Sequence, residues 1–175
     1  MLFSSFMKIE FREVKAGGSE FSFSVPPADL ELEADTFKFP EPIDVKVSAV
    51  KSGDEIIFQA TVSTLIEAEC ARCLELFEKR ISSKLQFVVQ FLDIGGPEDT
   101  GDDDFVVLPR SAEDYDISDR VREALILELP YKPLCKTSCK GLCPMCGQNL
   151  NEADCGCTQD ETDERWDTLR KLFGQ

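Results

Sequence analysis

Eight cysteines in four close pairs are the clearest potential metal ligands in this 175-residue sequence. The spacing within a pair is two, three, two and one intervening residues, for the pairs Cys70/Cys73, Cys135/Cys139, Cys143/Cys146 and Cys155/Cys157. Two thiolates separated by two residues can bind one tetrahedral metal ion. The Cys143-Pro-Met-Cys-Gly segment also has the proline and glycine typical of a zinc knuckle. Eight thiols therefore predict two closed sites of four cysteines, with two zinc ions per chain.

The sequence contains no histidine, which removes a large class of chemistry. A Ser-His-Asp triad, a Cys-His pair and an imidazole ligand are all excluded. The usual catalytic zinc sites contain histidine, so we expect any zinc here to be thiolate-bound and structural. We therefore predict a protein that is not an enzyme, with no catalytic residues and no small-molecule substrate.

Three other interpretations of the cysteines stay open. Buried free thiols are disfavoured by the polar, turn-rich surroundings of the pairs. A redox C-x2-C motif is disfavoured because Cys70 begins no thioredoxin-like βα unit. An iron–sulfur cluster is disfavoured because the run from Cys135 to Cys146 does not match ferredoxin spacings.

The pairs can combine into two sites in more than one way. Cys143/Cys146 with Cys155/Cys157 gives a local site, which leaves Cys70/Cys73 with Cys135/Cys139. Joining Cys70/Cys73 with Cys143/Cys146 instead unites the two C-x2-C pairs as in a zinc ribbon. We favour the first grouping because its short closing loop costs less entropy.

The segments before and between these pairs are predicted to form mostly strands. Period-two alternation of apolar residues, with turn signals between the segments, predicts an antiparallel, meander-like sheet from residues 6–11, 20–25, 43–50, 55–62, 65–70 and 79–91. An apolar stripe over 117–129, ended by Pro130, predicts the main helix, with Asp116 or Ser118 able to cap its start. The acidic, glycine-rich segment 93–104 predicts a surface loop, because it lacks the spacing of a calcium site.

The fold class is therefore α+β, with two parts. Residues 1–130 are expected to form the β-rich domain with its helix. Residues 131–175 are expected to form a cysteine-rich, zinc-binding tail that ends in a helix over 162–173, whose apolar stripe predicts a packing face. No apolar segment is long enough to span a membrane, and no signal peptide is visible, so we expect a reducing cytoplasm, where cysteines bind metal rather than form disulfides.

Charge is unevenly distributed along the chain. Its net charge of −15 disfavours a protein that coats nucleic acid through its overall field. The clearest basic stretches nevertheless lie beside cysteine pairs and predict a small RNA-contacting face of Arg72, Lys132, Lys136 and Lys140. The alternative is that these cations offset the negative charge of the metal–thiolate centres.

Several motifs together resemble the YceD family, also called the large ribosomal RNA subunit accumulation protein family. They are the Cys70-Ala-Arg-Cys73-Leu74 segment, the Leu129-Pro130 helix end, LCKTSCKGLCPMCGQNLNEADCGC over 134–157 and DERWDTLRKLF over 163–173. The resemblance implies a bacterial, cytoplasmic role in the synthesis, processing or stability of 23S rRNA, with no catalytic activity. Some relatives lack most of the later cysteines, which implies a stabilising part for the metal.

The resemblance and the residues together suggest a ribosome-biogenesis factor that binds a ribosomal protein, a large-subunit precursor or rRNA. The acidity favours a basic ribosomal protein as the direct partner. The alternative is a thiol–zinc redox switch or another zinc-dependent interaction module.

Overall fold

A mixed sheet forms the body of the protein, which a computed structural model describes over residues 7–32, 36–93 and 104–157. The strand order is β2 (Ser19–Val25), β4 (Ile43–Ser52), β5 (Glu55–Glu69), β6 (Leu76–Leu92) and β7 (Phe105–Pro109), with the short β3 (Phe37–Lys38) paired to β5. Neighbours from β2 to β6 are antiparallel, which confirms most of the predicted meander, but residues 8–10 of the segment predicted over 6–11 lie in a separate two-stranded sheet. β7 instead runs parallel to β6, so the sheet is mixed.

The strands follow the period-two pattern of their sequences. In β5 the even-numbered residues from Ile56 to Ala68 are buried, while their odd-numbered neighbours face the other side of the sheet. Gly53, at φ +61°, makes the turn between β4 and β5. The same face of β4 buries Ile43, Val45 and Val47, so the core lies on one side of the sheet.

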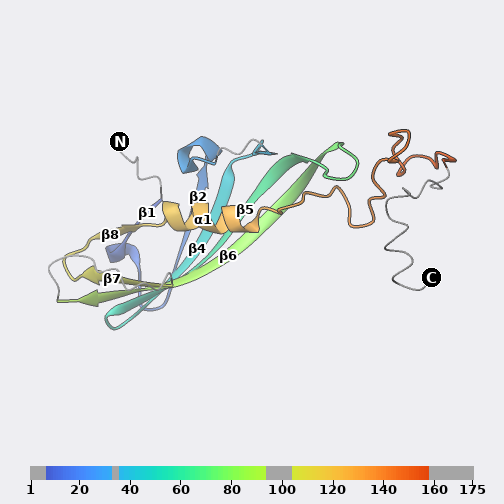
Figure 1. Cartoon of the computed structure of the whole chain (residues 1–175). Coiled ribbons are helices and arrows are strands. Elements are labelled where there is room, and N and C mark those ends of the chain that lie inside the picture. Colours follow the sequence, from blue (N-terminus) through green and yellow to red (C-terminus); the bar gives the residue numbers. More distant parts are fainter. Residues whose placement is uncertain (1–6, 33–35, 94–103, 158–175) are drawn as a thin grey trace, which may run out of the picture.

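The β5–β6 hairpin is longer than we predicted. Residues 55–62 were expected as a strand that 65–70 could continue, and the two do form one strand, which pairs continuously with β6 from Glu55–Gln90 to Glu69–Leu76. Figure 1 shows the hairpin reaching past the other strands toward the orange segment of the tail. The first cysteine pair lies at this hairpin tip, defined here as residues 70–75.

The inner face of the sheet is covered by α1 (Ser118–Glu128) and by a two-stranded ribbon of β1 (Lys8–Glu10) and β8 (Asp114–Asp116). Two 3-10 turns, Phe11–Glu13 and Pro27–Leu30, complete this layer. The predicted helix over 117–129 is confirmed, and the Asp116 carboxylate accepts hydrogen bonds from the backbone N–H and the hydroxyl of Ser118 at 2.9 and 2.6 Å.

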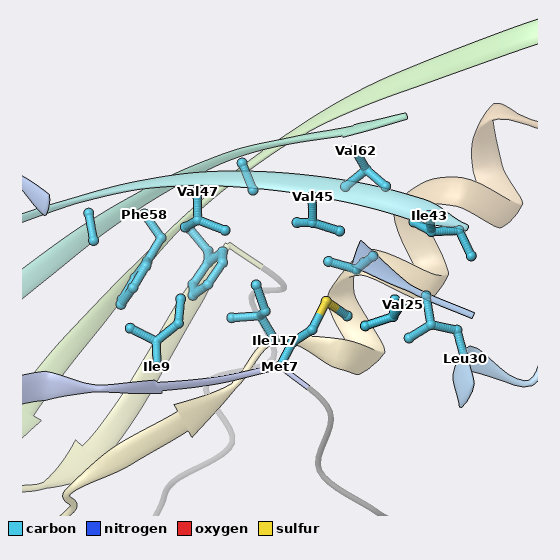
Figure 2. Close-up of a cluster of buried hydrophobic side chains, with 14 of the residues drawn as sticks. Met7, Ile9, Val25, Leu30, Ile43, Val45, Val47, Phe58, Val62 and Ile117 are labelled. Carbon is cyan, nitrogen blue, oxygen red and sulfur yellow. The ribbon is translucent and has the colours of Figure 1, made fainter. Parts of the chain in front are cut away.

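Figure 2 shows the core between the two layers, with Met7, Ile9 and Ile117 facing Val45 and Val62 of the sheet. Val121 and Leu125 bury the helix stripe against the same core. Each such fully buried apolar side chain stabilises the fold by about 1.5–3 kcal/mol. This core lies apart from Cys70, Cys73 and Cys139, which form a second buried cluster of their own.

Some predictions lie outside the part of the chain that the structure describes. They include the helix over 162–173 and most of the loop over 93–104. The domain boundary at residue 130 stays a prediction. Within the described ranges, no helix is both long and apolar enough to cross a membrane.

Candidate metal centres

The hairpin tip presents the first cysteine pair. Its turn is closed by two backbone hydrogen bonds, from the Leu74 N–H to the Cys70 carbonyl and from the Cys70 N–H to the Glu75 carbonyl, each 2.9 Å. Leu74 adopts a left-handed φ of +60°, which costs a non-glycine residue energy. Cys70 is completely buried and Cys73 nearly so, so both side chains point away from solvent.

The tail docks on this tip through its backbone. The Ala71 N–H donates to the Pro133 carbonyl at 2.8 Å, and the Leu142 N–H donates to the Arg72 carbonyl at 3.1 Å. Gly141 passes so close that an added Cβ would lie 3.0 Å from the Arg72 carbonyl oxygen, and its φ is +79°. Only glycine fits there without strain. These contacts bring the second cysteine pair to the first.

The four thiols at the tip form the bridging cluster of Cys70, Cys73, Cys135 and Cys139. The Cys70 and Cys139 sulfurs lie 3.8 Å apart, the Cys73 and Cys135 sulfurs 3.7 Å apart, and all four lie within 4.8 Å of one another. Four thiolates at about 2.3 Å from a tetrahedral zinc ion are about 3.8 Å apart. The bridging cluster can therefore hold a metal ion with little rearrangement.

The environment splits the acidities of these thiols. Burial raises the pKa of Cys70, but hydrogen bonds from the backbone of Cys135, Cys73 and Arg72 lower it by more. The resulting pKa is about 6. The Glu75 backbone lowers the pKa of Cys73, yet burial and the three neighbouring thiols raise it to about 12. Without metal, the cluster thus shares protons between its thiols. A bound cation would replace them.

Outer groups also contact the bridging cluster. Burial raises the pKa of Cys139, but hydrogen bonds from the Asn151 amide and the Gly141 backbone lower it overall. The Asn151 Nδ2 lies 3.4 Å from the Cys139 sulfur, and the Cys73 sulfur lies 3.8 Å from the Glu75 carboxylate. Sequence reasoning missed Glu75, Asn149 and Asn151. The Asn-x-Asn spacing next to the knuckle was the available signal, since such residues hydrogen-bond nearby backbone in turns.

The local cluster consists of Cys143, Cys146, Cys155 and Cys157, whose sulfurs also lie within 4.8 Å of one another. The Gly147 N–H donates to the Cys143 carbonyl at 2.9 Å, and Gly147 has a φ of +75°, as the knuckle motif requires. Unlike the bridging cluster, it exposes two of its thiols, Cys146 and Cys157. The structure thus groups the cysteines as the loop-length argument favoured.

Acidities are split in the local cluster as well. Hydrogen bonds from the backbone of Cys146 and Met145 lower the pKa of Cys143 to about 6. The side chains of Cys146 and Cys155 raise the pKa of Cys157 to about 12. Four sulfur donors with no other ligand type give a closed site, which suits a structural metal ion.

The predicted RNA-contacting residues lie near the bridging cluster, but two of them already have polar partners within the protein. The Arg72 guanidinium donates to the Cys139 carbonyl at 2.8 Å. The Lys140 ammonium lies 3.6 Å from the Asp154 carboxylate. Lys132 and Lys136 are exposed. Their contact with RNA stays a prediction.

Comparison with known proteins gives the chain a family. Residues 58–173 match the family model described as large ribosomal RNA subunit accumulation protein YceD. An uncharacterized protein of Mycobacterium tuberculosis is 32% identical over 75% of this chain and 61% of its own length. The large ribosomal RNA subunit accumulation protein YCED homolog 1, chloroplastic, is 26% identical in Arabidopsis thaliana, over 83% of this chain and 54% of that protein.

The same-named maize protein is 26% identical over 66% of this chain and 48% of its own length. The chain thus spans between 48% and 61% of the length of these curated relatives. No solved structure matches the chain. The matched residues include both cysteine clusters and most of the β5–β6 hairpin. This chain belongs to the YceD family of large ribosomal RNA subunit accumulation proteins.

Proposed function

We propose that this protein is a non-enzymatic ribosome-biogenesis factor that supports the synthesis, processing or stability of 23S rRNA in a bacterial cytoplasm. The observation that carries the proposal is the family match, because the family description names accumulation of large ribosomal RNA. The lack of histidine supports a non-catalytic role, since the sulfur donors form closed sets with no imidazole base beside them.

Two zinc ions per chain are part of this proposal, each bound by one cluster. The sulfur spacing in the bridging cluster suits a tetrahedral ion, and thiolates are ligands that zinc prefers. Bound zinc would supply a cross-link rather than an open Lewis-acid position. In the bridging cluster this cross-link joins the hairpin tip to the tail, which fixes the surface that a partner meets.

The partner that we favour is a basic ribosomal protein, alone or within a large-subunit precursor. The net charge of −15 attracts a cationic protein and repels RNA phosphates over most of the surface. Any direct contact with rRNA would be made by four basic residues, Arg72, Lys132, Lys136 and Lys140. Since Arg72 and Lys140 already have partners within the protein, this contact is expected to be weak.

Affinity capture from cell extract, with and without RNase, tests the proposal. We expect large-subunit components to co-purify with the chain and at least one ribosomal protein to remain after RNase treatment. We also expect cells that lack the protein to contain less 23S rRNA relative to 16S rRNA. Loss of every component on RNase treatment would overturn the protein partner, and an unchanged 23S level would overturn the function.

A redox switch is the second candidate, favoured by the exposure of Cys146 and Cys157. Exposed zinc-bound thiolates are the ones that oxidants reach first. Mild oxidation would then release one metal ion per chain and change the oligomeric state. If the intact chain keeps both metal ions and its size under oxidant, the switch is excluded while the assembly role is unaffected.

A further inference from the structure

A short loop of the local cluster reaches into the bridging cluster. The loop lies between Cys146 and Cys155, so a metal ion in the local cluster would close it. One of its side chains nevertheless contacts a thiol of the other cluster, and a second contacts a carboxylate beside that cluster. The Asn151 Nδ2 lies 3.4 Å from the Cys139 sulfur, and the Asn149 Nδ2 donates to the Glu75 carboxylate at the hairpin tip at 2.8 Å.

The two asparagines also hold each other. The Asn149 Oδ1 accepts from both the backbone N–H and the Nδ2 of Asn151, at 3.0 and 2.8 Å. The Asn151 Oδ1 accepts from the Lys140 backbone N–H at 2.9 Å. Both Nδ2 hydrogens of Asn151 are therefore used, one by Asn149 and one by Cys139. An amide with every polar atom bonded has one favoured orientation.

The backbone keeps this loop against the residues that join the clusters. The Leu150 N–H donates to the Gly141 carbonyl at 2.9 Å, and Leu142 forms a β-bridge with Asn149. Leu142 in turn donates to the Arg72 carbonyl at the hairpin tip. Backbone hydrogen bonds therefore hold the loop of the local cluster directly against the segment that follows Cys139.

We infer that Asn149 and Asn151 couple metal binding at the two clusters, so that filling one raises the affinity of the other. This inference rests on the metal sites of the proposed function. A metal ion in the local cluster restrains the loop ends at Cys146 and Cys155 and so pre-orders both asparagines. Asn151 then orients the Cys139 sulfur as a positioning residue, in the way that outer hydrogen bonds orient metal ligands. The coupling is necessarily reciprocal.

Cobalt(II) titration of the full-length, metal-free, reduced chain tests the coupling, in competition with a chelator of known affinity. One binding constant comes from a chain that keeps the bridging cluster alone (Cys146→Ser with Cys157→Ser). The other comes from a chain that keeps the local cluster alone (Cys70→Ser with Cys73→Ser). The product of the two constants is then compared with the overall two-metal constant of the unmodified chain.

We expect the overall constant to exceed the product about tenfold, within the 5- to 150-fold range usual for coupled sites. Repeating the three titrations with Asn151→Leu should bring the ratio close to one. Asn149→Ala, which keeps the Asn151 side chain, is a second variant and should lower the ratio as well. Gln148→Ala removes an exposed amide from the same loop and should leave the ratio unchanged.

A spectroscopic measurement distinguishes loss of the Asn151 hydrogen bond to the Cys139 sulfur from a general loss of folding. In the chain with the bridging cluster alone, Asn151→Leu removes a hydrogen bond to a cobalt-bound thiolate. The sulfur-to-cobalt absorption should then move to longer wavelength while the strand signal in circular dichroism stays constant.

Two results would overturn the coupling. If two metal ions bind and the overall constant equals the product, the coupling is wrong and the metal sites stand. If the unmodified chain binds no metal, the metal sites of the proposed function fail, and the coupling fails with them.

Discussion

The two cysteine clusters contain the same four donors but differ in what they connect. The bridging cluster joins residues 62 and 69 positions apart, as the Cys73–Cys135 and Cys70–Cys139 contacts show, whereas the local cluster lies within 15 residues of chain. Three of the bridging thiols are buried, while two of the local thiols are exposed. The two sets of four thiols thus differ in how far apart their residues lie along the chain and in how accessible they are to solvent.

This difference determines what each metal ion would do. Cross-linking distant residues restricts the unfolded chain more than cross-linking near neighbours, so the bridging cluster should contribute more to stability. The local cluster orders a short loop and is easier for chelators and oxidants to reach. Its influence on the rest of the molecule passes through the asparagines of that loop.

The largest contrast is expected between Cys73→Ser and Cys146→Ser. Each should remove one metal ion, but Cys73→Ser should also release the tail from the hairpin tip. A site filled at about 1,000 times its Kd stabilises the folded state by about 4 kcal/mol, which the tail would lose. Amide hydrogen exchange should show Ala71 and Leu142 unprotected in Cys73→Ser and still protected in Cys146→Ser.

The sheet serves as the internal control for this pair. Strands β2 and β4 and the core half of β5 pack on a core that contains no cysteine, so their amides should keep their protection in both variants. Protection lost across the whole sheet in Cys73→Ser would show that the two parts of the chain do not fold separately.

Metal affinity should rise steeply with pH at both clusters. Cys73 and Cys157 have pKa values raised to about 12, and the pKa values of Cys135 and Cys155 are also raised, so these thiols carry protons at pH 7. Metal binding must release them, at least two from each cluster, so each apparent affinity should increase at least about a hundredfold per pH unit near neutrality.

Below about pH 6 the dependence should become steeper. Cys70 and Cys143, whose pKa values are lowered to about 6, then bind protons as well. Competition titrations between pH 5.5 and 8 would measure both slopes. A flat profile would mean that the thiols are not the ligands.

A glycine pair gives a smaller and more local contrast. Gly141→Ala places a Cβ 3.0 Å from the Arg72 carbonyl oxygen at a φ of +79°, whereas Gly147→Ala meets nothing within 4 Å at a φ of +75°. In both variants the left-handed backbone should lower the free energy of unfolding by about 1–2 kcal/mol. Gly141→Ala should additionally weaken cobalt binding at the bridging cluster, and equal affinities in the two variants would contradict the close docking.

The smallest effect is expected from the lysines. Lys136→Gln with Lys140→Gln should flatten the salt dependence of RNA binding by at most about two units, one per lost phosphate contact. Lys140 already faces Asp154, so we expect a smaller change. Lys15→Gln with Lys51→Gln, which removes one exposed charge before β2 and one near the end of β4, is the matched control. An equal change in both double variants would remove any special role of the tail lysines.

Much of the sheet could be predicted because burial of one face makes apolar and polar residues alternate along each strand. That alternation places the apolar residues of β4, β5 and β6, and the apolar stripe over 117–129 places α1. The pattern does not say which strand is a neighbour. The parallel pairing of β7 to β6 and the β1–β8 ribbon were therefore missed, since short strands such as Asp114–Asp116 carry too few residues for a period.

The cysteine grouping could also be predicted, because loop entropy favours Cys143/Cys146 with Cys155/Cys157. The contacts that surround the clusters could not be predicted. Asn149 and Asn151 look like ordinary turn residues until the fold brings Glu75 and Cys139 beside them. Likewise, Arg72 was assigned to RNA from its charge alone, and its hydrogen bond to the Cys139 carbonyl became visible only once the hairpin tip met the tail.

Measuring the metal content of the protein tests whether its two four-thiol clusters hold structural zinc. The full chain, purified under reducing conditions without added metal, should contain two zinc ions by elemental analysis and by native mass spectrometry. Its eight thiols should become titratable only after a chelator removes the zinc. Bound iron, or no metal with all eight thiols freely reactive from the start, would contradict the account.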